Sequence, residues 1–411
     1  MISPGAEEHH APADVTLPAG TASAPSPSGG MRATAALLGF GLVVGLAAVE
    51  LVPRLLPGMM PRAFRTLARV YNARTAWQDM MLGDAYLGYK LKPDLDILFP
   101  SDGRQVAIRT TPLGLGSIGF RDLGMQPPFY AVAIGDSFTF CDDSPAEACW
   151  VRRLAGATGV SMATMGVNGY SSQAEVRMLD RYGRRLHPRL VIFSIFPNDF
   201  TDNVHFDQWT RSGTEDQFTW MRQNRRGRVT DWLARNSIAY QVVEGLGRVQ
   251  HRDIYNHRDA NLDFVFRLDK WWVMTLKGIE PLPGWHLMQQ ALRELRTTVA
   301  DMDAELMVVL IPPKEQVYWD VVRPYAPKHL QSVDVDRPYA VVRQFLAEQQ
   351  MHTCELVGPL REAARQGRQV YLRVSGHWND EGNAVAADAI AHCLRTEGLV
   401  PDATDKEPDR P

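Results

Sequence analysis

The sequence predicts an α/β protein, a three-layer α/β/α sandwich with a mainly parallel sheet and an N-terminal transmembrane helix. Two observations predict this organisation. After Phe129, short apolar runs alternate with helical stretches, a pattern typical of parallel strands that helices bury on both faces. Residues 33–49 form a run of 17 residues without a charge, which is just long enough to span a bilayer.

The composition is that of a globular protein with a large core, because 45% of the 411 residues are hydrophobic and 22% are charged. This length predicts two to three structural units, or one α/β domain with insertions. Lys and Arg number 44 against 47 Asp and Glu, a net charge of −3. No global positive field is therefore available, and we expect no nucleic-acid partner.

The N-terminal region divides into a tail and an apolar segment. Residues 1–30 are rich in Pro, Ala, Ser and Gly and are predicted to be disordered, with His9 and His10 solvated rather than metal-bound. Residues 31–56 are predicted to anchor the chain in a membrane; a cleaved signal peptide and a buried core helix are the alternatives. Residues 397–411 are predicted to form a second disordered tail.

The arginines around the apolar segment bear on which side of the membrane the main domain lies. Arg54, Arg62, Arg65 and Arg69 follow the segment, whereas only Arg32 precedes it. Positive residues prefer the cytoplasmic side, so this rule alone places the main domain inside the cell. The cysteines and a family resemblance, both described below, favour an extracytoplasmic, periplasmic domain instead.

Residues 57–128 are predicted to be a lead-in that packs on the main domain and carries no chemistry. It contains an amphipathic helix over Pro61–Met81 and extended pieces at 89–91 and 106–108. The main domain is expected over 129–396, with an insertion at about 201–283. The insertion contains Trp209, Trp220, Trp232, Trp271 and Trp272; a small helical cap with its own tryptophan core is favoured over a polymer-binding surface.

The main domain supplies the strands and helices of a flavodoxin-like sheet. Its predicted strands are Tyr130 to Ile134, Ser161 to Met165, Leu190 to Ile195, Leu306 to Ile311 and, more weakly, Met351 to Val357. Its predicted helices lie near Trp150 to Ala157, Ser172 to Tyr182, Trp285 to Asp301, Tyr339 to Gln349 and Asp380 to Leu394. Asn379 or Asp380 is expected to cap the last helix. Sites in such sheets lie at the carboxyl ends of the strands.

Polar motifs stand at those strand ends. The first strand is followed by Gly-Asp-Ser at 135–137, the second by Gly-Val-Asn-Gly at 166–169 and the third by Pro-Asn-Asp at 197–199. The last strand-to-helix connection reads Ser-Gly-His-Trp-Asn at 375–379. A serine needs a base and oxyanion donors to act as a nucleophile. Together these motifs offer each part of an acyl-transfer site.

The four motifs, in this order, resemble the SGNH hydrolase superfamily, also called GDSL esterases, over about residues 129–396. The resemblance implies that Ser137 is the nucleophile and His377 the general base. It implies that Gly169 and Asn198 donate to the oxyanion together with the Ser137 N–H, and that Asp136 is structural. Membrane-anchored bacterial relatives show a lead-in with a stretch like Gly119 to Asp122.

One position departs from the family pattern. An aspartate usually stands two residues before the histidine, where its carboxylate orients the imidazole, and this chain has Ser375 there. Three explanations stay open: a Ser-His dyad oriented by a backbone carbonyl, a substitute acid such as Asp380 or Glu381, and a domain that binds without turnover. A carboxylate within about 3 Å of the His377 nitrogen that faces away from Ser137 would favour the enzyme.

The four cysteines form two candidate pairs. Cys141 and Cys149 flank an acidic loop with Asp142, Asp143 and Glu147, and a second disulfide between Cys354 and Cys393 is also considered. Two disulfides favour an oxidising compartment, and four free thiols are the alternative. The stretch His251, Asp253, His257, Asp259 and Asp263 matches no known metal spacing, and a solvated loop is expected.

We therefore predict a serine esterase of the cell envelope that deacetylates or otherwise acts on acylated carbohydrate, with no metal or organic cofactor. Its partners are expected to be an ester-bearing small molecule or polysaccharide and the membrane, through residues 31–56. An O-acetyltransferase that uses the same residues is one alternative. A catalytically silent polysaccharide-binding or scaffolding subunit is the other.

Overall fold

The computed structural model describes residues 29–56, 77, 79–102, 104–225, 228–243, 254–267, 270–326 and 328–401. The chain divides into two compact units, Met1–Met59 and Met60–Pro411. The predictions for His9 and His10, for residues 61–76 of the lead-in helix and for 402–411 of the C-terminal tail lie outside the described residues.

The first unit contains one long helix, α1 (Gly29–Leu55). Within it, Ala33–Val52 has a mean hydropathy of 2.3, and none of this stretch is buried. Twenty apolar residues in a helix cover about 30 Å, the thickness of a bilayer core. The helix thus has the length and composition predicted for an anchor, criteria that a signal sequence also meets.

The second unit is built on a five-stranded sheet in the order β12-β11-β8-β6-β7, with every neighbouring pair parallel. The strands are β6 (Ala131–Gly135), β7 (Met162–Gly166), β8 (Leu190–Ile195), β11 (Glu305–Leu310) and β12 (His352–Glu355). Counted along the chain, this order is 2-1-3-4-5, which confirms the predicted flavodoxin-like sheet.

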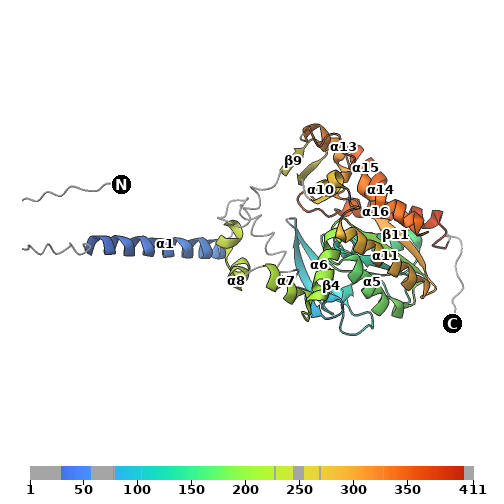
Figure 1. The fold of residues 1–411 in the computed structure, drawn as a ribbon, viewed down its shortest axis with the longest axis horizontal. Coiled ribbons are helices and arrows are strands. Elements are labelled where there is room, and N and C mark those ends of the chain that lie inside the picture. The colour runs from blue at the N-terminus through green and yellow to red at the C-terminus, as the bar shows by residue number, and fades with distance from the viewer. Residues whose placement is uncertain are drawn as a thin grey trace, which may run out of the picture. The chain divides into compact units, whose positions relative to one another are not determined.

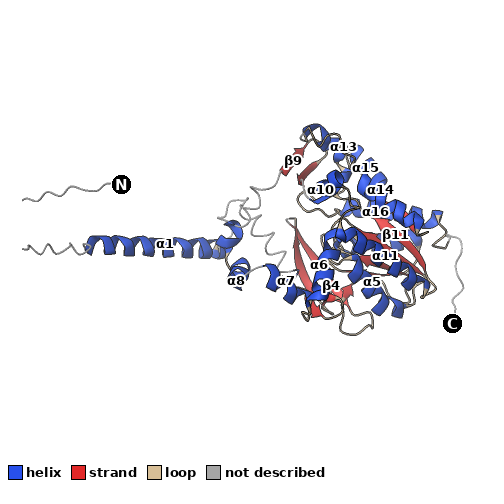
Figure 2. Ribbon diagram, viewed as in Figure 1, coloured by secondary structure: helices blue, strands red, loops and turns tan. Residues whose placement is uncertain are grey.

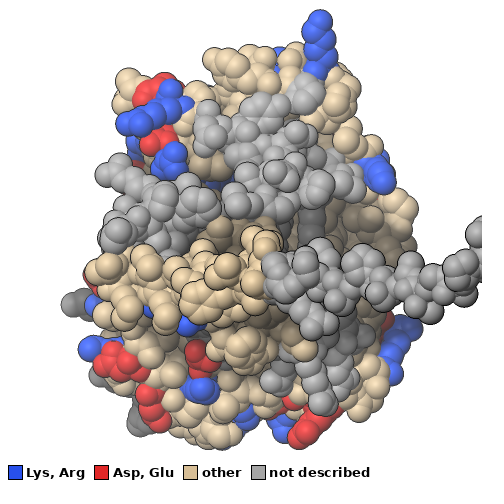
Figure 3. Space-filling model, turned by 90° about the vertical axis from the view of Figure 1, so that its left-hand side faces the viewer, with Lys and Arg blue, Asp and Glu red and all other residues tan. Residues whose placement is uncertain are grey.

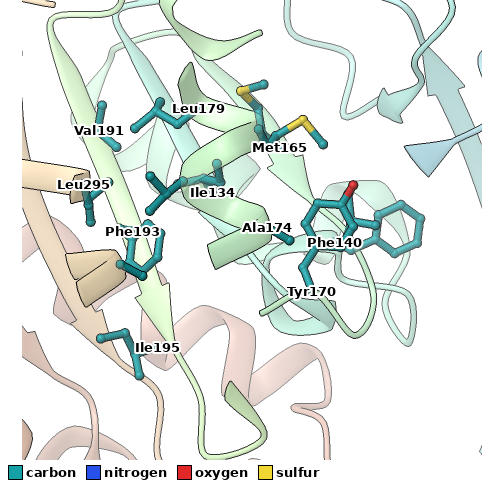
Figure 4. Packing of buried hydrophobic residues seen from close by; sticks show 14 of the residues in the cluster. Ile134, Phe140, Met165, Tyr170, Ala174, Leu179, Val191, Phe193, Ile195 and Leu295 are labelled. Carbon is teal, nitrogen blue, oxygen red and sulfur yellow. The ribbon is translucent and has the colours of Figure 1, made fainter. Parts of the chain in front are cut away.

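Helices cover both faces of this sheet (Figures 1 and 2). Alternate strand residues point to opposite faces, so Ile134 and Phe193 join one hydrophobic cluster and Ala133 and Ile192 the other. The first cluster, part of which Figure 4 shows, includes residues of α5 (Ser172–Arg181), α11 (Pro283–Ala300) and α14 (Arg337–Glu348). The second includes residues of α4 (Trp150–Thr158), α15 (Val357–Arg365) and α16 (Asp380–Thr396). The predicted three-layer sandwich is confirmed.

The lead-in forms two antiparallel pieces. β1 (Met81–Asp84) pairs with β2 (Gly88–Leu91), and β3 (Asp96–Ser101), β4 (Arg104–Thr111) and β5 (Phe120–Arg121) form a three-stranded sheet. Met81 was expected to end a helix; instead it pairs with Leu91 across the hairpin and is buried. The buried hydrophobic side chains of this region belong to the same cluster as Ile134, except Leu123, which joins the other cluster. The lead-in therefore packs on the five-stranded sheet and its helices.

The insertion contains α6 (Asp199–Ser212), α7 (Gln217–Arg225), α8 (Arg228–Asn236), the hairpin β9 (Ile254–Arg258) and β10 (Asp263–Arg267), and α10 (Lys270–Lys277). It is not the helical cap that we expected. Trp209 joins the cluster of Ile134, Phe264 joins the other cluster, and Trp232 is 61% exposed. Its described aromatic residues thus complete the cores of the sandwich or face solvent.

Short helices complete the second unit: α3 (Ser137–Phe140), α12 (Lys314–Val317), α13 (Trp319–Val322) and the 3₁₀ turns Ala146–Ala148, Gly183–Leu186 and Arg323–Tyr325. On the face drawn in Figure 3, basic and acidic side chains are intermingled over the described surface. This distribution agrees with the small net charge and gives that face no large region of a single sign.

Candidate active site

The carboxyl ends of three strands bring the first three motifs to one edge of the sheet. β6 lies between β7 and β8, with Gly135 opposite Gly166 and Ile134 opposite Phe193. Each motif begins at or just beyond these positions. Parallel strands end at the same edge, so the loops that carry Ser137, Gly169 and Asn198 start side by side.

Ser137 is the first residue of α3, directly after the end of β6. Asp136 caps this short helix, because its Oδ1 accepts a hydrogen bond from the Phe138 N–H at 2.9 Å. Asp136 is buried, and burial raises the pKa of its carboxyl to about 6. At Gly135 a Cβ would lie 1.9 Å from Ser194 Oγ, so a glycine is required where the strand turns into the helix. Asp136 thus has a structural position, as the family resemblance implies.

His377 reaches Ser137 from a tight hairpin before α16. Tyr371 and Trp378 form an antiparallel bridge, and the Leu372 N–H donates to the His377 carbonyl at 3.0 Å. The Nε2 of His377 lies 2.7 Å from the Ser137 Oγ, although the two residues are 240 positions apart in the chain. The structure therefore brings together the predicted nucleophile and base.

A carboxylate stands on the other side of the imidazole, and it belongs to Asp143. Its Oδ2 lies 2.5 Å from the His377 Nδ1 and also accepts a hydrogen bond from the Ser375 hydroxyl at 2.7 Å. The Ser101 hydroxyl donates to its Oδ1. Ser375 occupies the position where an aspartate is usual, and it binds the acid rather than replacing it. This geometry meets the criterion stated above for an enzyme.

The substitute acids considered from the sequence lie elsewhere. Asp380 pairs with Arg104 at 3.1 Å, and Glu381 pairs with Arg368. Both stand at the start of α16, where their negative charge favours the helix N-terminus. Neither of them orients His377. A substitute acid is present, but it is Asp143, and the side of the imidazole that a backbone carbonyl was to orient in a Ser-His dyad faces this carboxylate.

The loop that carries Asp143 is fixed at several points. Cys141 ends α3 in the left-handed conformation, with φ 58°, and forms a disulfide with Cys149. The Arg121 guanidinium donates to the backbone carbonyls of Cys141 and Ser144, at 2.7 and 2.9 Å. Arg104 donates to the Asp143 carbonyl. The second predicted disulfide, Cys354–Cys393, is also formed, so both cysteine predictions are confirmed.

Asp142 adds a second buried carboxylate beside the imidazole. Its Oδ1 lies 3.6 Å from the His377 Nδ1, and its Oδ2 accepts a hydrogen bond from the Asn168 side-chain amide. Burial, with the charge of Asp143, raises the pKa of Asp142 to about 7. Asp142 therefore ionises near neutral pH, where its charge acts on His377.

The imidazole and Asp143 have strongly shifted pKa values of opposite direction. Burial alone would lower the pKa of His377, but the charges of Asp142 and Asp143 and the hydrogen bond to Asp143 raise it to about 9. Burial alone would raise the pKa of Asp143, but the charge and the hydrogen bond of His377 outweigh it and lower that pKa to about 2. The arrangement favours the imidazolium–carboxylate pair.

These shifts predict the pH dependence of any reaction in which His377 is the base. Neutral His377 is the active form, so kcat/KM should rise with pH up to about 9. Asp142→Asn removes one negative charge and should lower the midpoint of this rise by about one pH unit. The pH profile of kcat/KM measures it, with the exposed Asp320→Asn as the control. An unchanged midpoint in Asp142→Asn would contradict the assigned cause.

Two backbone amides at the site are free to donate. Among the described residues, neither the Ser137 N–H nor the Gly169 N–H has a hydrogen-bond partner. Gly169 has a φ of 71°, a conformation that favours glycine, and is exposed to solvent. Free N–H groups at a nucleophile are the donors that an oxyanion requires.

Asn198 lies at the start of α6 and is half-buried. Its Nδ2 donates to the Asp202 carboxylate at 2.9 Å. An amide carries two N–H groups, so a second donor remains for a ligand. The structure thus places all four predicted site residues at the same sheet edge and joins Ser137 and His377 directly.

Within the described part of the chain, one group of side chains could hold a metal ion, namely Asp142, Asp143 and His377. The 2.5 Å hydrogen bond between His377 Nδ1 and Asp143 Oδ2 already uses the ligand atoms of two of these residues. In the insertion, His257 pairs with Asp259 at 2.8 Å and its ring stacks on Phe264. His251 and Asp253 lie outside the described residues.

A family profile matches the C-terminal part of this chain. Residues 282–408 match the family described as ALGX: SGNH hydrolase-like domain, acetyltransferase AlgX. The matched segment carries His377, and the serine, glycine and asparagine motifs precede it in the order of the superfamily, on its fold. The chain belongs to the SGNH hydrolase superfamily.

Curated proteins similar to this SGNH protein include two named "Probable alginate O-acetylase AlgJ". The protein of Pseudomonas putida KT2440 is 28% identical over 133 residues, 31% of this chain and 33% of the relative. The protein of Azotobacter vinelandii is 27% identical over 115 residues, 28% of each chain. The chain thus spans a third or less of the length of the curated relatives that it matches.

Solved structures similar to this SGNH protein include an acetylxylan esterase from Geobacillus stearothermophilus. It is 13% identical with a TM-score of 0.34, over 66% of this chain and 94% of that one. A GDSL-like lipase from Bacteroides thetaiotaomicron VPI-5482 is 12% identical with a TM-score of 0.32, over 66% of this chain and 89% of that one.

The residues that surround the imidazole on its far side were not predicted from the sequence. Asp143 was noticed only as part of an acidic loop, and Ser101, Arg104 and Arg121 lay in a region to which no chemistry was assigned. A signal was present: two carboxylates lie between two cysteines directly after the nucleophile turn of this SGNH protein. A disulfide there folds the carboxylates back toward the serine.

Proposed function

We propose that this protein is a serine-dependent acyl-ester enzyme that acts on acylated carbohydrate in the cell envelope. The observation that carries the proposal is the continuous chain Ser137 Oγ, His377 Nε2, His377 Nδ1 and Asp143 Oδ2, with contacts of 2.7 and 2.5 Å. Nucleophile, base and orienting acid in this sequence are the parts that an acyl transfer requires.

The proposed reaction has two halves. In the first, Ser137 Oγ attacks the ester carbonyl carbon while His377 Nε2 takes its proton, and the N–H groups of Ser137 and Gly169 with the Asn198 amide stabilise the oxyanion. The ester C–O bond then breaks, and His377 returns the proton to the departing alcohol. In the second half, an acceptor hydroxyl attacks the acyl-Ser137 ester, His377 takes the acceptor's proton, and Ser137 is released with that proton.

Hydrolase and transferase differ only in the acceptor, which is water in one and a carbohydrate hydroxyl in the other. The matched family and the curated relatives carry acetyltransferase and O-acetylase in their names, which supports O-acetyl transfer as the second candidate function. The carboxylate at His377 argues against the catalytically silent subunit. Without an acid, the imidazole would not be held in the tautomer that accepts the serine proton.

An envelope location is supported by two features. Both described disulfides form, and disulfides persist in oxidising compartments outside the cytoplasm. α1 has the length and hydropathy of a membrane span. We propose a single-pass anchor with the catalytic domain on the extracytoplasmic side, against the orientation that the arginine distribution alone suggests.

Covalent labelling tests the proposed nucleophile. The full-length chain in detergent should react with a fluorophosphonate probe at Ser137, and Ser137→Ala and His377→Ala should each abolish labelling, with the exposed Ser117→Ala as the control. Mass spectrometry of an oligosaccharide incubated with an acetyl donor then separates transfer from release of acetate. A folded wild-type protein that takes up no label would refute the proposal.

A further inference from the structure

We propose that Tyr89, in the β1–β2 hairpin, is a positioning residue for the oxyanion donor Gly169. It acts through the peptide bond between Asn168 and Gly169. This inference rests on the proposed function, because it assigns a role to the same site. It also gives the lead-in a part in catalysis that the sequence did not suggest.

The hydroxyl of Tyr89 donates to the Asn168 carbonyl oxygen at 2.9 Å, and Tyr89 is 2% exposed. That carbonyl and the Gly169 N–H belong to one planar peptide unit and point in opposite directions. A bond that fixes the carbonyl therefore fixes the direction of the N–H. It also polarises the peptide, which makes the N–H a stronger donor.

The same peptide is held from a second side. The Asn168 side chain donates to Asp142, and Asn168 is 6% exposed. The neighbouring Tyr170 hydroxyl donates to the Tyr89 backbone carbonyl, so strand β2 and the Gly169 loop are joined in both directions. Gly169 itself has no described hydrogen bond from its N–H. The loop is thus held by hydrogen bonds on both sides of Gly169, while the Gly169 N–H stays free for a ligand.

The Tyr89 ring is fixed well enough to act as a support. It stacks on Phe218 at 4.7 Å between ring centroids and contacts Trp77 and Tyr170 edge-on at 5.5 and 5.2 Å. A Cβ on Gly169 would lie 3.1 Å from the Tyr89 hydroxyl, so this hydroxyl also limits where the loop can lie.

The test compares Tyr89→Phe, which keeps the ring and removes the hydroxyl, with the wild type. We expect kcat to fall roughly 10-fold, less than the loss of a whole oxyanion donor, while KM stays within about twofold. A trifluoromethyl ketone, which becomes an oxyanion when Ser137 adds to it, should bind more weakly by the same factor as kcat/KM falls. The acid limb of the pH profile should not move, because His377 and Asp143 are untouched.

Tyr130→Phe is the matched control. Its hydroxyl also donates to a backbone carbonyl, that of Leu399 at 3.3 Å, but it precedes β6 at the opposite edge of the sheet. Kinetics and inhibitor affinity should stay at wild-type values in this variant. Thermal unfolding of both variants shows that the assays are made on folded protein.

The outcomes separate this inference from the function on which it rests. Activity that survives in Ser137→Ala refutes the proposed function, whatever Tyr89 does. Activity that needs Ser137, together with wild-type kcat and ketone affinity in Tyr89→Phe, overturns the inference alone. A loss in Tyr89→Phe that lies wholly in KM, or that Tyr130→Phe shows equally, also overturns it.

Discussion

Asp143→Asn is expected to lower kcat by about 10³- to 10⁴-fold, the loss typical of an amide in place of a triad acid. The side chain keeps its shape, but an amide N–H can then face the His377 Nδ1 and favour the tautomer that cannot accept the Ser137 proton. Steady-state kinetics with an activated acetyl ester measures this loss. Glu381→Gln is the control, because Glu381 pairs with Arg368 and should leave kcat unchanged.

An exchange of residues sharpens this prediction. Ser375 Oγ lies 3.2 Å from the His377 Nδ1, so a carboxylate at position 375 would reach the imidazole once position 143 is small. Asp143→Ser alone should be nearly inactive, and adding Ser375→Asp should recover at least about 10-fold in kcat, because the acid then orients the ring again. A double variant no better than Asp143→Ser, or a fully active Asp143→Asn, would contradict the role of Asp143.

Removal of the Cys141–Cys149 disulfide is expected to abolish most activity while the protein stays folded. The two cysteines are 8 residues apart and close the loop that carries Asp142 and Asp143. The loop also begins at Cys141, whose left-handed backbone directs the chain back from α3. In Cys141→Ala/Cys149→Ala the acid loses this constraint, and we expect kcat to fall by about 10²-fold or more, as after other losses of triad geometry.

The second disulfide provides the matched control. Cys354 and Cys393 are 39 residues apart and join β12 to α16, away from the imidazole. The chain-entropy argument gives a larger stability loss for this longer loop, about 4 against about 3 kcal/mol. We therefore expect stability and kcat to rank the two double variants in opposite order. In a denaturant titration Cys354→Ala/Cys393→Ala should lose more stability than Cys141→Ala/Cys149→Ala, but it should keep its kcat. Equal kcat in the two double variants would contradict the role of the shorter loop.

The sheet and the contact between Ser137 and His377 could be predicted, because each depends on short patterns and motifs that are visible in the sequence. The apolar runs at 131–135, 162–166 and 190–195 are buried on both faces, and a helix follows each one, with side-chain caps from Asp136 and Ser171 at the first two. Once the strand order is known, the loop residues meet at one edge without further information. The pairing of Ser137 with His377 followed from the resemblance of their motifs to the SGNH hydrolase superfamily, which implies a nucleophile and a base at these positions.

The acid and its supports could not be predicted in the same way, because they depend on tertiary contacts. Asp143 reaches His377 across 234 residues, and Ser101 reaches Asp143 across 42. Neither contact leaves a periodic pattern. Tyr89 and Arg121 look like ordinary strand residues in the sequence, and only the packing of the lead-in on the main domain gives their polar atoms a partner. The insertion was misjudged for the same reason, because its aromatic residues complete cores that lie elsewhere.

The placement of two members of the proposed triad on one short segment has a consequence for when the protein becomes reactive. Ser137 and Asp143 lie six positions apart, whereas the hairpin with His377 arrives far later in the chain. A nascent polypeptide that has already formed the first three strands therefore holds a serine with no proton acceptor. We expect it to remain chemically inert while it is still on the ribosome. The proposed acyl-ester chemistry then becomes possible in a single step, when the segment around residues 370–380 docks.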